Sequence, residues 1–358
     1  MATNNISLPN PKKSSARQIN AIRLFRRQAR ALTPFVTLII LVIFFSIFSQ
    51  DHRFATTANF LNILQQASAL AIMATGITYV LLVGEIDLSI GGIATASGVL
   101  ASYLLVSLNW PGWLCALSGV VLAVLVGLVN GLVTSRLGVP SFMTTLAMGM
   151  ITSGIAVFLT KGRPIFDVPE ISAALGTGKI GLLPTILVVA SIFMLIGWLV
   201  SKYTRFGRYV YMVGGNREAA MLSGVSSKNI VTMVMVISGA LAGIAGVINT
   251  GRLGSANPDI FSDATLNVIA AVVLGGTSLF GGVGSVASTV IGLIVFGMLN
   301  NGLNLVNIDI YLKAFITGVI LLLALILNVL ALRLGQSEQE ARIEEVVATE
   351  EQVSTPVE

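Results

Sequence analysis

Long apolar segments follow one another along most of this 358-residue chain, and they restrict its fold more than any other feature. Hydrophobic residues make up 55% of the sequence and charged residues only 10%, too few to cover a soluble protein of this size. A helix needs about 20 apolar residues to cross the hydrocarbon core of a bilayer. By that length the sequence predicts about ten spans, at residues 32–49, 61–83, 90–108, 112–134, 141–160, 182–200, 230–250, 264–281, 285–303 and 311–331. We therefore predict an all-α, polytopic helical membrane protein, with half-helices or re-entrant segments as the alternative for the glycine-rich stretches near 84–92 and 275–284.

The distribution of basic residues predicts how these spans are oriented. Residues 1–31 contain seven lysines and arginines, no acid and no signal-peptide pattern, so we expect a basic cytoplasmic segment before a retained first helix. Ten crossings then leave fifteen of the 21 basic residues on the cytoplasmic side, in agreement with the positive-inside rule, and both termini are cytoplasmic. The chain divides into this segment, a transmembrane domain at 32–331 with a cytoplasmic loop at 201–229, and an acidic tail at 332–358 that we expect to be disordered. The glycine- and proline-rich outer loop at 161–183 predicts a non-helical cap.

A weak internal repeat relates the two halves of the transmembrane domain. Laying residue 84 on residue 275 aligns GEIDLSIGGIATAS with GGTSLFGGVGSVAS, and five of the fourteen positions match. Small residues are common in membrane helices, so convergent packing is an alternative explanation. Repeated halves built around broken helices are frequent in transporters, with the pathway at the repeat interface.

A polar island at Thr204–Lys228 separates two of the apolar segments. Its core reads GGNREAAMLSGV, which predicts a turn at the two glycines, a short helix capped by the asparagine, and a stop at the last glycine. The residues of this pattern are Gly214, Gly215, Asn216, Glu218, Ala219, Ala220, Ser223 and Gly224. A small-sided helix on the cytoplasmic face is suited to docking into a cleft of a soluble partner. The alternative is that the basic residues of this loop only determine topology.

Glu85 and Asp87 are the only acids between residues 60 and 160. A carboxylate within hydrocarbon is unfavourable by several kcal/mol unless it is paired or hydrated, so each marks a cavity, a cation partner or a wetted helix end. Because Asp87 precedes Ser89 and Gly91 at the start of a predicted span, we interpret it as a helix N-cap in preference to a proton or Na⁺ site. Further glycines in the two predicted breaks permit close packing or gating, at Gly275, Gly276, Gly281 and Gly282.

Neutral polar side chains lie along the predicted span at 61–83. They are Asn62, Gln65, Gln66, Thr75 and Thr78. Amides and hydroxyls on a membrane helix either hold helices together or face a polar path. A path for a sugar-like solute needs many weak, neutral hydrogen-bond sites, so both interpretations stay open.

Other features argue against several functions. Cys115 is the only cysteine and His52 the only histidine, so we expect no metal site built from such ligands. The stretch GTGKI at 176–180 lacks the first glycine and the final Ser or Thr of a phosphate-binding P-loop, so we expect no nucleotide site and no cofactor. The basic residues are spread as topology markers, which argues against binding of nucleic acid.

Four segments carry a family resemblance: NILQQASALAIMATGITYVLLVGEIDLSIGG at 62–92, TRFGRYVYMVGGNREAAMLSGV at 204–225, DATLNVIAAVVLGGTSLFGGVGS at 263–285 and LNNGLNL at 299–305. They resemble the permease subunits of bacterial ATP-binding-cassette importers for ribose, xylose, galactose and related simple sugars. The resemblance implies an inner-membrane permease, dimeric and not itself an enzyme. It also implies a cytoplasmic ATPase that binds the ATP and a periplasmic sugar-binding protein. The helix pattern of the polar island would then be the coupling helix that enters the ATPase cleft.

Three alternatives remain at this point. An ion-coupled secondary transporter would use Glu85 and Asp87 and would need no ATPase. A membrane receptor or scaffold would transport nothing. An importer of the same class would carry a nucleoside, a branched-chain amino acid or a furanosyl signalling molecule in place of a monosaccharide.

Overall fold

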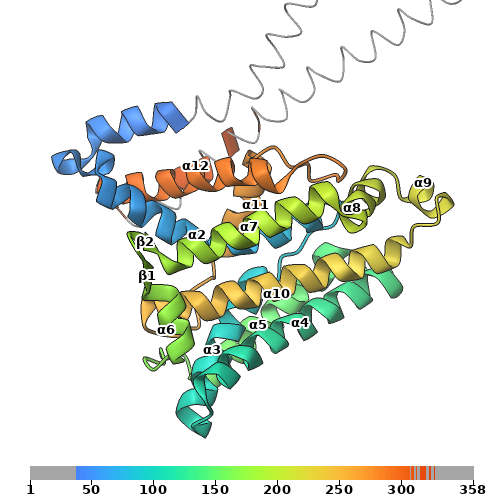
Figure 1. Cartoon of the computed structure of the whole chain (residues 1–358), viewed down its shortest axis with the longest axis horizontal. Helices are drawn as coiled ribbons and strands as arrows, with labels where there is room; N and C mark the ends of the chain where they lie inside the picture. The colour runs from blue at the N-terminus through green and yellow to red at the C-terminus, as the bar shows by residue number, and fades with distance from the viewer. Residues whose placement is uncertain are drawn as a thin grey trace, which may run out of the picture.

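The computed structural model describes residues 38–306, with 308–309, 312, 315–319, 322–323 and 326, and these residues form a bundle of helices (Figure 1). After a helix at Leu38–Phe48, the elements in chain order are the 3-10 helix η1 (Gln50–Ala55), α2 (Thr57–Leu82), α3 (Ile90–Leu108), α4 (Gly112–Arg136), α5 (Ser141–Thr160), α6 (Glu170–Thr177), β1 (Lys179–Ile180), β2 (Leu183–Pro184), α7 (Thr185–Tyr203), α8 (Arg205–Gly215), α9 (Arg217–Leu222), α10 (Ser227–Leu253), α11 (Ala264–Leu274) and α12 (Val286–Leu305).

Within the described part of the chain, seven helices are long and apolar enough to cross a membrane, namely α2, α3, α4, α5, α7, α10 and α12. Each begins and ends within four residues of a predicted span, because apolar length is visible directly in the sequence. The first predicted span is described only over Leu38–Phe48, and the predicted span at 311–331 lies largely outside the described residues. The predicted segments at 1–31 and 332–358 lie outside them entirely.

The predicted span at 264–281 is wrong in its second half. Helix α11 ends at Leu274 after 11 residues, which is too short to cross a bilayer. The chain continues as an irregular segment, residues 275–285, which we call the α11–α12 loop. In it Gly276, Gly281 and Gly282 have φ angles of 94°, 90° and 72°, a region that glycine adopts without strain. The glycine cluster therefore ends the helix, and α11 is the half-helix that the sequence offered as an alternative.

The outer loop at 161–183 is also not the non-helical cap that we predicted. Residues Glu170–Thr177 form helix α6, and Lys179–Ile180 pairs with Leu183–Pro184 as a small antiparallel hairpin. Glu170 lies in the first turn of α6, where a negative charge interacts favourably with the helix dipole.

Helix α10 is central to the bundle and packs against α4, α3, α2 and α6. Its contact with α4 uses small residues at every fourth position of α4, at Ala123, Gly127 and Gly131. A Cβ on Gly127 would lie only 2.6 Å from the carbonyl oxygen of Met235, so the two backbones touch directly. Close approach through small residues is how helices associate in a bilayer, where the hydrophobic effect gives no drive between them.

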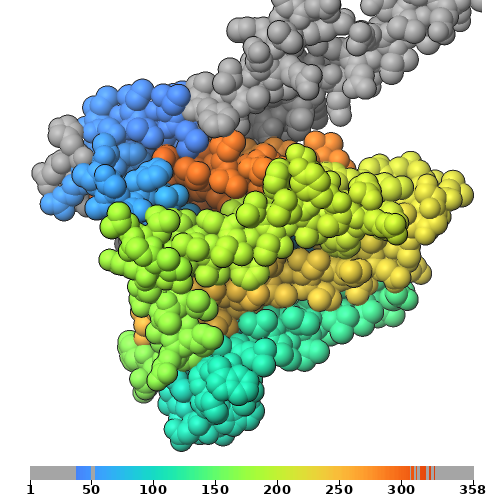
Figure 2. All heavy atoms as spheres, viewed as in Figure 1, coloured from blue at the N-terminus to red at the C-terminus, as the bar shows by residue number. Residues whose placement is uncertain are grey.

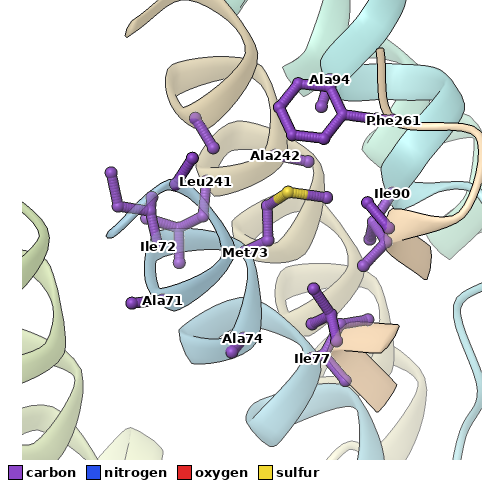
Figure 3. Packing of buried hydrophobic residues seen from close by; sticks show 14 of the residues in the cluster. Ala71, Ile72, Met73, Ala74, Ile77, Ile90, Ala94, Leu241, Ala242 and Phe261 are labelled. Atoms are coloured by element: carbon purple, nitrogen blue, oxygen red, sulfur yellow. The ribbon is translucent and has the colours of Figure 1, made fainter. Parts of the chain in front are cut away.

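The main apolar core surrounds α2 and α10. Met73 and Ile77 of α2 belong to one buried cluster with Ile90 of α3 and Ala242 of α10 (Figure 3). The outer faces of α4, α5 and α7 expose large apolar side chains, as expected where helices face lipid.

The bundle has two ends, which we name after the short helices that they carry. The α9 end carries α8, α9, the α11–α12 loop and the connection between α2 and α3 at residues 83–89, called here the α2–α3 loop. The α6 end carries α6 and the β1–β2 hairpin (Figure 1). Figure 2 shows that the segment with α9 protrudes beyond the neighbouring helices.

Candidate functional site

Two short helices form the polar island. The Thr204 hydroxyl caps α8 by accepting a hydrogen bond from the Gly207 N–H at 3.1 Å, and the Asn216 side chain caps α9 by accepting from the Ala219 N–H at 2.9 Å. Gly224 follows α9 with a φ of 78°. The predicted cap and stop are confirmed. The predicted glycine turn is wrong, because Gly214 and Gly215 are the last two residues of α8.

Helix α9 buries one face and exposes the other. Ala220 is 1% exposed and packs with Val83, Val213 and Val225, so it is a core residue and cannot contact a docked partner. Leu222 is 91% exposed. Glu218, Ala219 and Ser223, which the sequence placed in the docking pattern, are exposed together with Met221. The face of α9 that is available to a partner therefore consists of small, apolar and acidic side chains.

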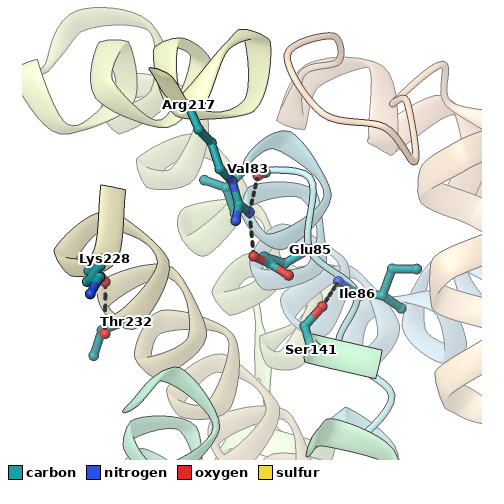
Figure 4. A network of polar contacts seen from close by, with 7 residues as sticks. All are labelled: Val83, Glu85, Ile86, Ser141, Arg217, Lys228 and Thr232. Carbon is teal, nitrogen blue, oxygen red and sulfur yellow. Dashed lines mark hydrogen bonds and ion pairs between the residues drawn. The ribbon is translucent and has the colours of Figure 1, made fainter. Parts of the chain in front are cut away.

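Arg217, the first residue of α9, connects this helix to the α2–α3 loop (Figure 4). Its guanidinium forms an ion pair with Glu85 and donates a hydrogen bond to the carbonyl oxygen of Val83 at 3.3 Å. The Glu85 side chain is only 10% exposed, whereas that of Arg217 is 49% exposed. A cation partner was one of the three environments that the sequence analysis left open for Glu85, and the sequence did not identify that cation as Arg217.

The C-terminal half of α8 contacts the end of α2 and the α11–α12 loop. A Cβ on Gly214 would lie 1.7 Å from the carbonyl oxygen of Leu82, so only glycine fits against the end of α2. The Gly282 N–H donates to the same carbonyl oxygen at 2.9 Å. The Tyr211 hydroxyl donates to the carbonyl oxygen of Gly284 at 2.8 Å, and burial raises the pKa of this phenol. The end of α2, the end of α8 and the α11–α12 loop thus meet at one point.

The other glycines that the sequence predicted to allow close packing or gating lie in different contacts. A Cβ on Gly281 would lie 2.7 Å from the Gly214 carbonyl oxygen, so this glycine belongs to the same junction. Gly275 packs against the backbone of α12 at Ser288. Gly91, near the start of α3, donates its N–H to the Thr265 hydroxyl of α11 at 3.1 Å. Gly276 has open space around it, so its role is conformational.

Asp87 is buried in the α2–α3 loop. Its carboxylate accepts hydrogen bonds from the Ser89 N–H at 2.9 Å and from the Ser238 hydroxyl of α10 at 2.9 Å. Asn130 of α4 donates to the Ser89 hydroxyl at 2.8 Å. Burial raises the pKa of the Asp87 carboxyl, and the bonds from Ser89 and Ser238 oppose this shift. The interpretation of Asp87 as a helix N-cap is confirmed in one respect, because its carboxylate accepts from a backbone N–H at the start of α3. It is wrong in position, because Ser89 is the N-cap residue, and the expected hydration is wrong, because Asp87 is 1% exposed.

Two hydroxyls of α5 hold the backbone of the same loop. The Ile86 N–H donates to the Ser141 hydroxyl at 3.1 Å, and the Leu88 N–H donates to the Thr145 hydroxyl at 3.0 Å. The α2–α3 loop is therefore bonded to α4, α5 and α10, while Arg217 bonds it to α9. Through Arg217, α9 is thus connected to a loop that contacts all three helices.

The predicted path residues of α2 fall into two groups. Thr78 shares a 2.9 Å hydrogen bond with Thr289 of α12, and the Thr75 hydroxyl donates to the Ala71 carbonyl oxygen within its own helix. Both threonines are buried, so in this conformation they serve helix packing. Near the other end of α2, the exposed Gln66 donates to Asn62 at 3.1 Å. Gln65 is half-buried beside them.

A polar cavity of about 460 Å³ lies at the α6 end of the bundle. Its polar lining residues come from α2, α10, α11, α12 and the segment before α11: Gln66, Asn249, Arg252, Asp259, Ser262, Asp263, Asn267, Asn300 and Asn304. Of these, only Gln66 is among the path residues predicted from the sequence. The asparagines and the arginine of the lining lie near the ends of apolar segments, and this position in the sequence could have marked them as site residues. Two of them, Asn300 and Asn304, belong to LNNGLNL at 299–305.

A bundle of bilayer-length helices, with a short capped helix projecting from one end and a polar cavity at the other, defines a multi-pass membrane permease. The chain belongs to the family described as branched-chain amino acid transport system / permease component, which it matches over residues 59–325.

Three sugar permeases are similar to most of this chain. The ribose import permease protein RbsC of Haemophilus influenzae is 38% identical over 296 residues, which are 82% of this chain and 91% of that protein. The D-allose transport system permease protein AlsC of Escherichia coli is 33% identical, covering 83% and 90%. The xylose transport system permease protein XylH of Escherichia coli is 30% identical, covering 81% and 89%. No solved structure matches the chain.

Proposed function

We propose that this chain is the permease subunit of an ATP-binding-cassette importer that carries a monosaccharide of the ribose, xylose or galactose type from the periplasm into the cytoplasm. The observation that carries the proposal is the contact between Arg217 of α9 and Glu85, because it joins an exposed docking helix to a loop held by three membrane helices. The relatives support the cargo, since ribose, allose and xylose are all monosaccharides.

The proposal orients the α9 end toward the cytoplasm, with ten spans in the bacterial inner membrane and both termini on the cytoplasmic side. Arg205, Arg208 and Lys228 flank α9, and Arg217 is its first residue. The seven basic residues of 1–31 would lie on the same side, as the positive-inside rule requires. The polar cavity then faces the periplasm, where a sugar-binding protein delivers the cargo. Two permease subunits form the membrane part of the complex.

In the proposed mechanism the permease performs no covalent chemistry and binds no ATP. The exposed face of α9 enters a cleft of the ATPase subunit, where the bulky Leu222 and Met221 are removed from water. Closure of the ATPase on ATP displaces α9, and the Arg217–Glu85 pair passes this displacement to the α2–α3 loop. Nucleotide binding shifts the access equilibrium only insofar as the two states bind the closed ATPase unequally.

The test is transport in proteoliposomes that contain the permease, its ATPase and its binding protein. We expect uptake of labelled ribose, xylose or galactose that requires internal ATP and is abolished when the ATPase is inactivated by mutation. Uptake driven by an ion gradient without ATP would contradict the proposal and favour the secondary transporter that uses Glu85 and Asp87. Competition of unlabelled nucleosides or furanosyl compounds, without competition by sugars, would move the cargo to the alternative solutes.

A further inference from the structure

We propose that the polar cavity at the α6 end is a low-affinity subsite where the permease itself contacts a neutral monosaccharide during transit. The inference rests on the proposed function, and it assigns substrate contact to residues of α10, α11 and α12 that lie away from the α9 end. The volume of the cavity, about 460 Å³, is within the usual range of about 300–1,000 Å³ for small-molecule pockets.

The cavity is formed where four helices and one loop converge. Asn249 of α10 is 4% exposed and accepts a hydrogen bond from the Arg252 Nε–H at 2.9 Å, which fixes the guanidinium plane in the wall. Asn267 of α11 and Asn300 of α12 line it from other helices. Polar side chains from elements far apart in the sequence thus line the same cavity, and most of them are positioned by helices.

The lining has the chemistry of a polyhydroxylated ligand. Each sugar hydroxyl both donates and accepts hydrogen bonds, and an amide side chain offers both functions within one group. The side chains of Leu70, Leu253 and Ile260 also line the cavity and supply apolar surface for the C–H face of a sugar, whereas Phe261 and Phe296 lie beneath it as buried core residues. Pockets for small ligands typically combine such apolar walls with a few placed polar groups.

The same lining favours weak binding and rejects anions. Neutral amides form ordinary hydrogen bonds, so a sugar is held loosely enough to leave, as conduction through any pathway demands. The lining contains two carboxylates, of Asp259 and Asp263, and one guanidinium, of Arg252, so its formal charges sum to −1. A phosphorylated sugar would meet this excess of negative charge, and we expect the cavity to favour neutral sugars over it.

The experiment uses the permease–ATPase complex in lipid nanodiscs without binding protein and with D-ribose as the probe, followed by saturation-transfer NMR. Asn267→Leu and Asn300→Leu keep the side-chain volume but remove the amide. Asn229→Leu on α10 is the matched control, because Asn229 is an exposed asparagine of the same helix as Asn249 and lies outside the cavity lining. We expect saturable ribose binding that each cavity variant weakens about 3- to 10-fold, which corresponds to the loss of one hydrogen bond. Asn229→Leu should bind ribose as the wild type does, and ribose 5-phosphate should not bind.

Three results would overturn this inference. They are no saturable ribose signal with the wild-type complex, an equal effect of Asn229→Leu, and cavity variants that weaken capture of the binding protein while ribose binding stays unchanged. If wild-type proteoliposomes import ribose with ATP under any of these results, the subsite fails and the proposed function stands. If they import no sugar, the proposed function itself fails.

Discussion

Removing the charge of Arg217 tests the connection between α9 and the membrane helices most directly. The variant Arg217→Gln leaves the Glu85 carboxylate, whose side chain is 10% exposed, without its cation partner. It also loses the charged donor to the Val83 carbonyl oxygen. We expect α9 to detach from the α2–α3 loop more often, so that the ATPase hydrolyses ATP with less sugar imported per ATP.

The magnitude follows from how deeply the pair is buried. Breaking a fully buried ion pair is unfavourable by about 3–5 kcal/mol, whereas an exposed pair contributes about 0.2–1 kcal/mol. Glu85 is near the buried limit and Arg217 is half exposed, so we place the loss at about 1–2 kcal/mol. That energy raises the detached population about 5- to 30-fold.

The assay is a double-mutant cycle with Arg217→Gln, Glu85→Gln and both together, read as sugar imported per ATP hydrolysed in proteoliposomes. Because the double variant leaves no unpaired charge, it should recover part of the loss of either single variant, with an interaction energy of about 1–2 kcal/mol. Arg208→Gln is the control, since Arg208 is an exposed arginine of the same segment whose loss leaves the Glu85 pair intact. Additive effects of the two single variants, within about 0.5 kcal/mol, would refute the reasoning.

Further predictions concern the two faces of α9 and the glycines before it. Ala219→Trp, on the exposed face, should abolish co-purification of the ATPase in pull-down while the melting temperature of the permease in detergent is unchanged; retained co-purification would exclude this face from docking. Ala220→Trp, in the core, should instead lower the free energy of unfolding by about 1–3 kcal/mol through overpacking, seen as a lower melting temperature. Gly214→Ala should prevent the close packing of α8 on α2, because its Cβ would lie 1.7 Å from the Leu82 carbonyl oxygen, and the yield of folded protein measures this. Gly215→Ala, with no atom within 4 Å of the added Cβ, should fold normally; equal yields of the two variants would contradict the packing described.

Apolar length made the membrane helices predictable. The bounds of α3 and α5 agree with the predicted spans at both ends, because Pro, Gly and polar residues punctuate the chain there. The cap at Asn216 was predictable for a similar reason, since capping depends on residues three positions apart. The end of α11 was harder, because apolar composition continues past Leu274 and only the glycine pairs signal the break.

Contacts between distant segments were not predictable from one sequence. Arg217 and Glu85 are 132 residues apart, and composition gives no reason to pair Glu85 with this arginine in preference to another. A small residue such as Ala220 suits a docking face and a helix contact equally well, and its burial depends on how α9 lies against Val83 and Val213. The polar cavity is assembled from α2, α10, α11 and α12, so its members are adjacent only after folding.

Helix α10 contacts both the α2–α3 loop and the polar cavity, and this limits how a displacement of the loop can change the cavity. Ser238 of α10 bonds Asp87 in the α2–α3 loop, and Asn249 lies in the cavity wall 11 residues further on, about 16 Å along the helix axis. Between them α10 meets α4 through small residues with backbone contact. Because this contact is close, we expect a displacement of the loop to move α10 and α4 together. We then expect change in the cavity to come from relative motion of its other walls, α11 and α12, which are joined by the glycine-rich loop that contacts α8.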